Sequence, residues 1–387
     1  MDTPGHSLAA NTRVIVGISG GVDSAVAAAL LLQQGYQVEG LHMTNWEGDD
    51  AYCTAAEDLQ EARRVCADLG IALHTANFSE AYRRKVFADF LAEYAAGRTP
   101  NPDVACNRHI KFGDCYVLAR RLGADCFATG HYARIVHRPD GRRLLKAKDA
   151  SKDQSYFLHT VRPEVLEHVS FPLGELTKTR VRRIANDLGL PNHRRKDSTG
   201  ICFIGERPFR EFLQQYLDSP EGNIETLDGQ VIGRHVGLMF YTLGQRQGLG
   251  IGGVRGYPDE PWYVAGKDAE RNVLNVVQGR EHPALWSAAL TTDPAVWLAG
   301  QSPGEQLRCT VRTRYRQVDV ACTARVAADD TLTLQFDKPV WAVTPGQYAV
   351  LYQGDECLGG APIAASGRVA HAADRTAAPR VSRCKTA

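Results

Sequence analysis

The chain has 387 residues, of which 44% are hydrophobic and 23% charged, a composition typical of a soluble globular protein with more than one domain. Its 45 Lys and Arg residues nearly balance its 44 Asp and Glu residues, so any nucleic-acid surface must be a local basic patch. No run reaches the roughly 18 apolar residues of a membrane span, and the N-terminal stretch does not have the pattern of a secretory signal. We therefore expect a cytoplasmic protein with no membrane association.

Short apolar runs alternate with helical stretches through the first third of the chain. The pattern predicts strands at 13–19, 38–44, 72–78 and 125–130, and helices at 24–34, 55–69, 80–96 and 111–122. This alternation indicates a parallel sheet covered on both faces, and such sheets bind ligands at the carboxyl ends of their strands.

The character of the sequence changes after a basic, helical stretch that ends near Leu217. Glycines and short strands dominate the next 60 or so residues, and closely spaced strands of a small barrel or sandwich follow. We predict an α/β domain at 13–217, a small central β-rich domain at 218–280 and an all-β barrel at 281–364, with flexible tails at 1–12 and 365–387.

A glycine-rich loop, Gly17-Ile-Ser-Gly-Gly-Val-Asp-Ser24, follows the first strand and opens the first helix. Its glycines let backbone N–H groups converge on an anion, and the helix presents its positive end there. Asp23 could cap the helix or help to hold a metal. The loop has no Walker-type lysine, and a tight turn without a ligand is the alternative interpretation. SGGVDS resembles the signature of the PP-loop ATP pyrophosphatases, which adenylate a substrate oxygen and release pyrophosphate.

Ten cysteines are scattered without a C-x-x-C pair, so we expect neither zinc nor an iron–sulfur cluster. Two of them lie among polar, loop-forming residues. Cys106 is predicted on a loop just before a helix, where basic residues at 108, 109 and 111 favour its thiolate. Cys202 is predicted on an irregular segment after the basic run 194–196. Six others are predicted to be structural: Cys53, Cys115, Cys126, Cys309, Cys322 and Cys357.

Two further patterns each allow a functional and a structural interpretation. Arg308, Arg312, Arg314 and Arg316 occupy even positions of one predicted strand, so they share a face that suits either a phosphate backbone or plain solvent exposure. Asn101-Pro-Asp103 could contact a polar base or form a simple turn.

Taken together, eight segments of the chain resemble the bacterial tRNA-specific 2-thiouridylases, over residues 13–363. They are GISGGVDS (17–24), GLHMTNWEGDD (40–50), TPNPDVACNRHIKFG (99–113), ATGHYAR (128–134), SKDQSYFL (151–158), DSTGICFIGER (197–207), TLGQRQGLGIGG (242–253) and VRTRYRQ (311–317). The resemblance implies an adenine-nucleotide-hydrolase-like PP-loop fold for the N-terminal domain and a tRNA-binding C-terminal barrel. It also implies ATP-dependent adenylation of the 2-oxygen of the wobble uridine in Lys, Glu and Gln tRNAs. Sulfur from a cysteine persulfide then gives 2-thiouridine, with release of AMP and pyrophosphate.

The resemblance further implies a role for individual residues. Cys202 would carry the persulfide, and Cys106 would either attack the activated base or release the sulfur, with a transient Cys106–Cys202 disulfide. Asp103 would contact the flipped base as an acid or base. ATP would be bound by Gly17, Ile18, Ser19, Gly20, Gly21, Val22, Asp23, Ser24, Met43 and Gly130. The tRNA would be contacted by Asn101, Pro102, Asp103, His131, Lys152, Asp153, Gln154, Arg314, Tyr315 and Gln347.

Magnesium is expected from the pyrophosphate chemistry, and a sulfur-relay protein or a cysteine desulfurase is expected as the sulfur donor. Two alternatives are weaker. An amide- or guanidine-forming synthetase would have no need for two loop cysteines or an arginine-bearing β-domain. A non-catalytic tRNA-binding or sulfur-carrier protein would have no need for an intact phosphate loop.

Overall fold

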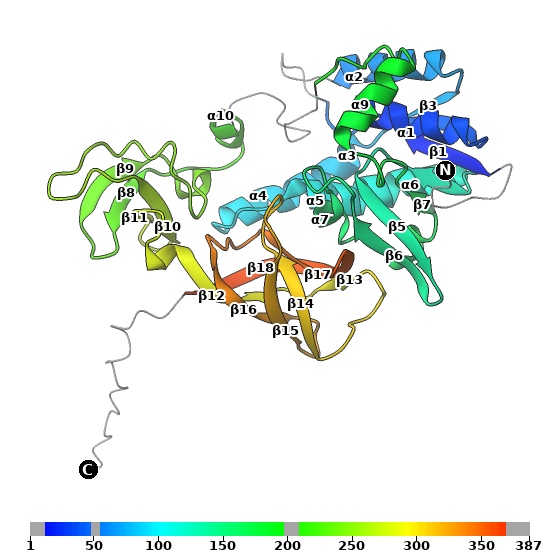
Figure 1. The fold of residues 1–387 in the computed structure, drawn as a ribbon. Coiled ribbons are helices and arrows are strands. Elements are labelled where there is room, and N and C mark those ends of the chain that lie inside the picture. The colour runs from blue at the N-terminus through cyan, green and yellow to red at the C-terminus, as the bar shows by residue number, and fades with distance from the viewer. Residues whose placement is uncertain (1–11, 48–54, 197–208, 369–387) are drawn as a thin grey trace.

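The computed structural model describes residues 12–47, 55–196 and 209–368 (Figure 1). The N-terminal part is built on a five-stranded parallel sheet with the order β3-β2-β1-β4-β7. Its strands are β1 (Arg13–Gly17), β2 (Gln37–Thr44), β3 (Leu73–Asn77), β4 (Cys126–Ala128) and β7 (Val169–Ser170). The predicted strands at 13–19, 38–44, 72–78 and 125–130 are therefore confirmed, and so is the parallel sheet.

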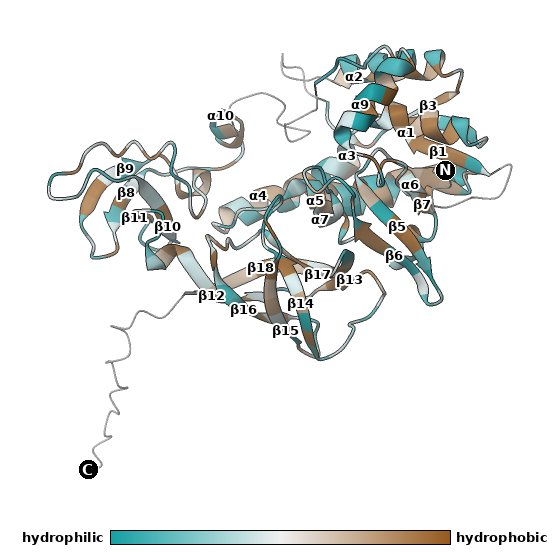
Figure 2. Ribbon diagram, viewed as in Figure 1, coloured by the Kyte–Doolittle hydropathy of each residue, from teal (hydrophilic) through white to brown (hydrophobic). Residues whose placement is uncertain are grey.

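Helices cover both faces of this sheet because successive residues of β1 point to opposite sides. Val14 and Val16 pack with residues of α1 (Val22–Gln33) and α2 (Ala55–Asp68). Ile15 packs on the other side against a continuous helical run. That run comprises α5 (Pro102–Cys106), the π-helical segment η2 (Asn107–Cys115) and α6 (Tyr116–Arg121). α1 is hydrophobic along most of its length, whereas α2 and α9 (Lys178–Asp187) carry hydrophilic residues on the outside (Figure 2).

A second helical run carries the chain from β3 toward the other domains. It comprises α3 (Ser79–Tyr82), the π-helical segment η1 (Arg83–Phe87) and α4 (Ala88–Ala95). Phe87 and Phe90 of this run form an aromatic cluster with Trp46 and with Phe212 of α10 (Phe209–Leu213). This cluster anchors the start of the central part of the chain to the N-terminal part.

The central part is a four-stranded sheet with its own apolar core and the order β10-β11-β8-β9. Its strands are β8 (Gly222–Thr226), β9 (Val231–His235), β10 (Trp262–Asp268) and β11 (Val273–Gln278). η3 (Leu238–Phe240) follows β9, and η4 (Pro283–Leu285) follows β11. The short helices α7 (Ser155–Leu158) and α8 (Pro163–Leu166) belong to the N-terminal part and pack in its core.

The C-terminal part closes into a barrel, as predicted. Strands β12, β16, β15, β14, β17 and β18 pair in that order, and β12 pairs with β18 to complete the circle. They span β12 (Trp286–Thr292), β14 (Gln306–Arg312), β15 (Val320–Val326), β16 (Leu332–Trp341), β17 (Tyr348–Gln353) and β18 (Glu356–Arg368), and β13 (Val296–Trp297) adds to β18.

A hairpin from the N-terminal part extends the sheet of the barrel. It consists of β5 (Ala133–Arg138) and β6 (Gly141–Lys146), and β6 pairs with β18 through Leu145 and Glu356. One apolar core contains Ile15 of the parallel sheet together with Tyr352 and Cys357 of the barrel. The N-terminal part and the barrel are thus held together by a shared core and a shared sheet.

Candidate active site

The glycine-rich loop at 17–24, called the phosphate loop after its expected ligand, joins the carboxyl end of β1 to the first turn of α1. Gly20 has a φ of +78°, and a Cβ there would lie 2.7 Å from the backbone oxygen of Asp58, so this position requires glycine. The Ser24 hydroxyl accepts a hydrogen bond from the Ser19 N–H at 3.2 Å and donates one to the Gly21 carbonyl at 3.1 Å. The side chains of the loop therefore hold it closed. It leads into the N-terminus of α1, and the free backbone N–H groups at a helix N-terminus favour binding of an anion.

Two cations lie on the phosphate loop. Lys178 of α9 donates to both carboxylate oxygens of Asp23 at 2.8 Å, and the Tyr132 hydroxyl donates to one of them at 2.9 Å. An Arg195 guanidinium nitrogen lies 3.3 Å from the Gly20 carbonyl oxygen, to which it donates. Each cation is also paired with a carboxylate, Lys178 with Asp23 and Arg195 with Asp58, so the positive charge at the loop is balanced by two carboxylates.

Met43 and Gly130 lie at the carboxyl ends of the two strands that flank β1. Met43 is near the carboxyl end of β2, and Gly130 follows the carboxyl end of β4. A Cβ on Gly130 would lie 2.7 Å from the backbone nitrogen of Ser24, so this glycine lets the chain approach the phosphate loop closely. Both residues therefore occupy the sheet edge where a nucleotide is expected, and their contact with adenosine stays a prediction.

Cys106 lies in a helix, and the predicted loop at this position is wrong. α5 begins at Pro102, with Asn101 as its N-cap residue, and continues without interruption through η2 and α6. The preceding helix ends at Ala95, before the prolines, but the next helix begins at Pro102 and not at Lys111. The prediction failed because the missing N–H and fixed φ of proline are tolerated in the first helical turn. Cys106 is 3% exposed and packs in the cluster that contains Trp46.

Asn45, which directly follows β2, is a site residue that the sequence did not single out. Its side-chain nitrogen lies 4.0 Å from the Cys106 sulfur. Its buried side-chain oxygen has no hydrogen-bond partner among the described residues, which is costly unless a ligand supplies one. The contact between Asn45 and Cys106 brings α5 to the same sheet edge as the phosphate loop. In the sequence, the only sign that Asn45 belongs to the site is its position directly after a predicted strand.

Asp103 lies in the first turn of α5, on the side of the chain that solvent reaches. Although the residue as a whole is exposed, crowding by nearby protein atoms raises the pKa of its carboxyl group, and Lys111 opposes this shift. A carboxyl group with a raised pKa takes up a proton more readily, as a base in a reaction must. Cys202 lies outside the described residues, so its proximity to Cys106 stays a prediction.

Several residues predicted to contact tRNA make internal hydrogen bonds. The buried Asp153 accepts from the Arg312 guanidinium at 2.6 Å and from the Ala147 N–H at 3.0 Å. The Gln154 side chain accepts from the Tyr132 N–H at 2.9 Å. These bonds fasten the 147–154 loop to the barrel and to the segment that follows β4. Lys152 is half-buried in the same loop.

Arg314 and Tyr315 lie just beyond the end of β14. Arg314 donates to the carbonyls of Leu243 and Ala342 at 2.8 and 2.6 Å, and burial lowers the pKa of its guanidinium. Tyr315 is half-buried, with its ring centroid 4.3 Å from that of Phe157. Arg314 thus links the central part to the barrel, and its contact with tRNA stays a prediction.

His131 and Gln347 are engaged inside the protein. A ring nitrogen of His131 lies 2.6 Å from the Thr129 hydroxyl, and burial lowers the pKa of this histidine well below its ordinary value, which favours its neutral form. The Gln347 side chain donates to the carbonyls of Thr99 and Pro100 at 2.9 and 3.4 Å. Gln347 therefore contacts the chain just before Asn101.

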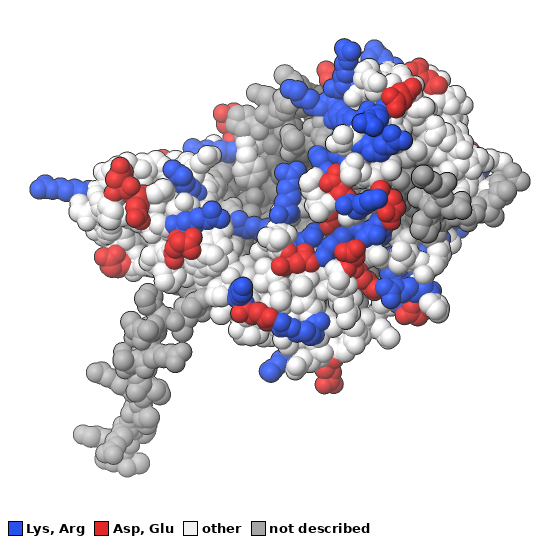
Figure 3. All heavy atoms as spheres, viewed as in Figure 1, with Lys and Arg blue, Asp and Glu red and all other residues white. Residues whose placement is uncertain are grey.

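The predicted row of four arginines on one strand is wrong. β14 ends at Arg312, and Arg316 has a φ of +64°, so Arg314 and Arg316 lie in a turn. Arg308 is paired with Asp337, and Arg312 bridges Asp153 and Asp319. The even spacing was misleading because a strand pattern does not reveal where the strand ends. Basic side chains still gather between α9 and the barrel on the face shown in Figure 3, interspersed with acidic ones.

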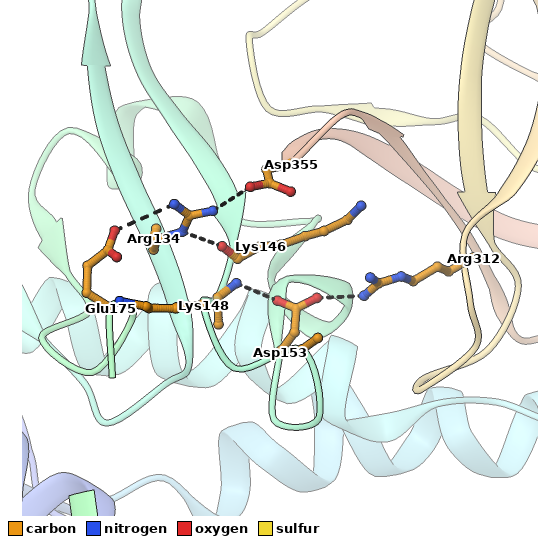
Figure 4. A pocket seen from close by; sticks show the side chains of 9 residues that line it. Arg134, Lys146, Lys148, Asp153, Glu175, Arg312 and Asp355 are labelled. Carbon is orange, nitrogen blue, oxygen red and sulfur yellow. Dashed lines mark hydrogen bonds and ion pairs between the residues drawn. The ribbon is translucent and has the colours of Figure 1, made fainter. Parts of the chain in front are cut away.

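A cavity of about 420 Å³ opens where the β5–β6 hairpin meets the 147–153 loop and the barrel (Figure 4). Arg134 from the hairpin pairs with Asp355 and Glu175 at its edge, and Asp153 meets Arg312 across it. The phosphate loop takes no part in its lining. This cavity adjoins the segment predicted to contact tRNA and is separate from the nucleotide edge of the sheet.

The remaining described cysteines have the surroundings of structural thiols. Burial raises the pKa of Cys66 to about 11 and those of Cys115 and Cys126 to about 12, and it also raises that of Cys357. Two further thiols face each other across β14 and β15, with the sulfurs of Cys309 and Cys322 3.6 Å apart. Over 12–47, 55–196 and 209–368, no three His, Cys, Asp or Glu side chains form a metal-binding group.

Comparisons with known proteins identify a family profile for each of the three parts of the chain. The chain matches the family profiles described as tRNA methyl transferase HUP domain (12–206), tRNA methyl transferase PRC-barrel domain (210–278) and Aminomethyltransferase beta-barrel domain (287–363). It is 59% identical to the tRNA-specific 2-thiouridylase MnmA of Chromohalobacter salexigens, over 91% of this chain and 92% of that protein. The identity to the protein of the same name from Alcanivorax borkumensis is 57%, over 91% and 97%.

Among solved structures, the U34-tRNA thiolase NcsA from Methanococcus maripaludis matches 54% of this chain and 65% of its own. The sequence identity is 18% and the TM-score is 0.35. Within the described residues, no helix is long and apolar enough to cross a membrane.

Proposed function

The chain belongs to the bacterial tRNA-specific 2-thiouridylase family, and on this premise we propose that it converts the wobble uridine of Lys, Glu and Gln tRNAs to 2-thiouridine. The reaction uses ATP and a persulfide sulfur, supplied in the cytoplasm by a cysteine desulfurase or a relay protein. The observation that carries this proposal is the contact between Asn45 and Cys106. It brings a thiol to the sheet edge that holds the phosphate loop, so a nucleotide and a sulfur nucleophile can meet there.

In the first step the uracil 2-oxygen attacks the α-phosphorus of ATP, and the bond to the β-phosphate breaks to release pyrophosphate. The uracil loses its N3 proton as the 2-oxygen becomes a phosphate ester. Asp103 is the group that we assign to accept this proton, because it lies in the first turn of the helix that carries Cys106 and its raised pKa suits a base. The phosphate loop and Lys178 hold the triphosphate, and Asp23 is the carboxylate of the loop that could share Mg²⁺ with it.

In the second step the outer sulfur of a Cys202 persulfide attacks C2 of the base, and AMP leaves. The Cys106 thiolate then attacks the Cys202 sulfur, which releases the sulfur on the base and forms a Cys106–Cys202 disulfide. A cellular thiol reduces this disulfide to restore both cysteines. The other order, in which Cys106 attacks the activated base directly, predicts a covalent link between Cys106 and tRNA.

The adenylation step has a direct test in the release of pyrophosphate, because AMP leaves only in the second step. Labelled ATP is incubated with the protein and a wobble-uridine tRNA, or with the same tRNA carrying cytidine at the wobble position as the matched control. We expect pyrophosphate release only with the uridine tRNA. Equal pyrophosphate release with both tRNAs, or pyrophosphate release with a small amine acceptor and no tRNA, would contradict the proposal and favour a synthetase.

A further inference from the structure

The connection between α4 and α5, residues 97–101, leads directly into the segment that carries Asp103 and Cys106. It is too short to form a helix or strand of its own. The amide N–H of Arg98 donates back to the Glu93 carbonyl at 2.9 Å, which continues the end of α4. Beyond this point, the connection is contacted by both β-rich domains.

The barrel holds the connection from one side. The Thr99 N–H donates to the Pro345 carbonyl at 3.0 Å, and the Gln347 side chain donates to the carbonyls of Thr99 and Pro100. Gly346 has a φ of +90°, and a Cβ there would lie 2.8 Å from the Thr99 nitrogen. The barrel loop is therefore shaped to press its backbone against the connection.

The central domain holds the connection from the other side. Lys267 of β10 donates from its ammonium group to the Gly97 carbonyl at 3.1 Å. Burial lowers the pKa of Lys267 to about 8, and no carboxylate among the described residues pairs with it. A desolvated cation without a counter-ion is unfavourable for folding, so stability does not explain a lysine at this position.

The two holding domains are themselves joined next to this contact. Arg314 of the barrel donates to the Leu243 carbonyl of the central domain, and also to the Ala342 carbonyl and the Thr344 hydroxyl of the barrel loop. Gln347 follows three residues after Thr344. The barrel and the central domain are thus fixed to each other close to where they hold the connection.

We propose that Lys267 is a positioning residue, which together with Gln347 fixes the connection 97–101 and thereby sets where Asn101 and Asp103 meet the target base. This inference rests on the proposed function for the base contact itself. The proposal gives the central domain a role in the reaction, because Lys267, the one lysine in residues 218–280, donates to the connection that precedes α5. A shift of about 1 Å at such a segment costs up to roughly 100-fold in rate.

The test compares Lys267→Met, which keeps the length of the side chain but removes the donor, with Lys267→Arg, which keeps a donor. Arg234→Met is the matched control, since it removes an exposed cation from the same sheet. For each protein, hydrogen exchange is measured at the Thr99 amide, and kcat and the tRNA KM are measured for thiolation. Gln347→Met acts on the same connection from the barrel and keeps the test available if Lys267→Met does not fold.

We expect Lys267→Met and Gln347→Met to speed exchange at Thr99 by about tenfold without speeding it throughout the protein. We also expect kcat to fall by roughly 10- to 100-fold, with a tRNA KM within about twofold of wild type. Lys267→Arg should restore part of the kcat. A raised KM with unchanged exchange would overturn the proposal and make Lys267 a tRNA contact, and faster exchange everywhere would make it purely structural. Exchange needs no substrate, so it tests the positioning even if the wild type thiolates no tRNA.

Discussion

The phosphate loop and the connection 97–101 lie in the same domain but are held in shape in different ways. The loop is closed by Ser19 and Ser24, which are 5 positions apart, whereas Thr99 is held by Gln347, 248 positions away. The loop can therefore form as soon as its strand and helix are in place. The connection 97–101, which sets where Asn101 and Asp103 are proposed to meet the target base, takes its final position only when all three domains have assembled. Nucleotide binding and base positioning should therefore respond to different substitutions.

The largest effect, a loss of thiolation without a loss of ATP affinity, is expected at Asp103. Asp103→Asn removes the carboxylate assigned to take the uracil proton while keeping the size of the side chain. We expect thiolation to fall by about 100- to 10,000-fold, with ATP affinity unchanged, because Asp103 lies on α5 and not on the loop. Single-turnover thiolation and equilibrium ATP binding measure the two effects, and a matching loss of ATP affinity would show that the two regions are not separate.

The next largest effect is expected in the loop. Gly20→Ala forces a Cβ within 2.7 Å of the Asp58 carbonyl oxygen, so the loop backbone must move. We expect kcat/KM for ATP to fall by about 100-fold. Gly35→Ala is the matched control, because Gly35 has a similar φ of +85° with nothing within 4 Å. Equal losses in the two variants would mean that backbone strain, and not the shape of the loop, is responsible.

A smaller effect is expected from the cation on Asp23. Lys178→Met removes a positive charge that lies 2.8 Å from that carboxylate. We expect ATP affinity to fall by about tenfold, as for the loss of one charge-assisted hydrogen bond, and Lys178→Arg to be less affected. Isothermal titration with ATP gives the result, and tRNA affinity that falls by the same factor would place Lys178 on the RNA surface instead.

The last prediction concerns the free energy of unfolding as a function of pH. Because burial lowers the pKa of Lys267 to about 8 from 10.5, the unfolded chain binds more protons than the folded chain between these values. Stability from this group therefore rises as pH increases through that window. Relative to Lys267→Met, the wild type should gain up to about 3 kcal/mol between pH 8 and 10.5. Denaturant unfolding of both proteins measures this difference, and parallel pH profiles would contradict it.

Features held by contacts between neighbouring residues could be predicted from the sequence, and features held by contacts between distant residues could not. The loop 17–24, the parallel sheet and the barrel follow from local patterns, because each depends on neighbouring residues or on strand periodicity. The helix at Cys106 was missed because Pro102 signals both a break and a first helical turn. Asn45, Lys267 and the role of Gln347 could not be predicted, since their contacts join residues far apart in the sequence and no spacing encodes them.

The central claim is that this chain transfers sulfur to the wobble uridine by means of two cysteines, and mass analysis of digested tRNA tests it most directly. Wild type, Cys106→Ser and Cys202→Ser are each incubated with tRNA, ATP, magnesium and a persulfide source. We predict that the wobble uridine gains one sulfur with the wild type and none with either variant. An unchanged wobble uridine with the wild type, or full thiolation by Cys106→Ser, would contradict the account.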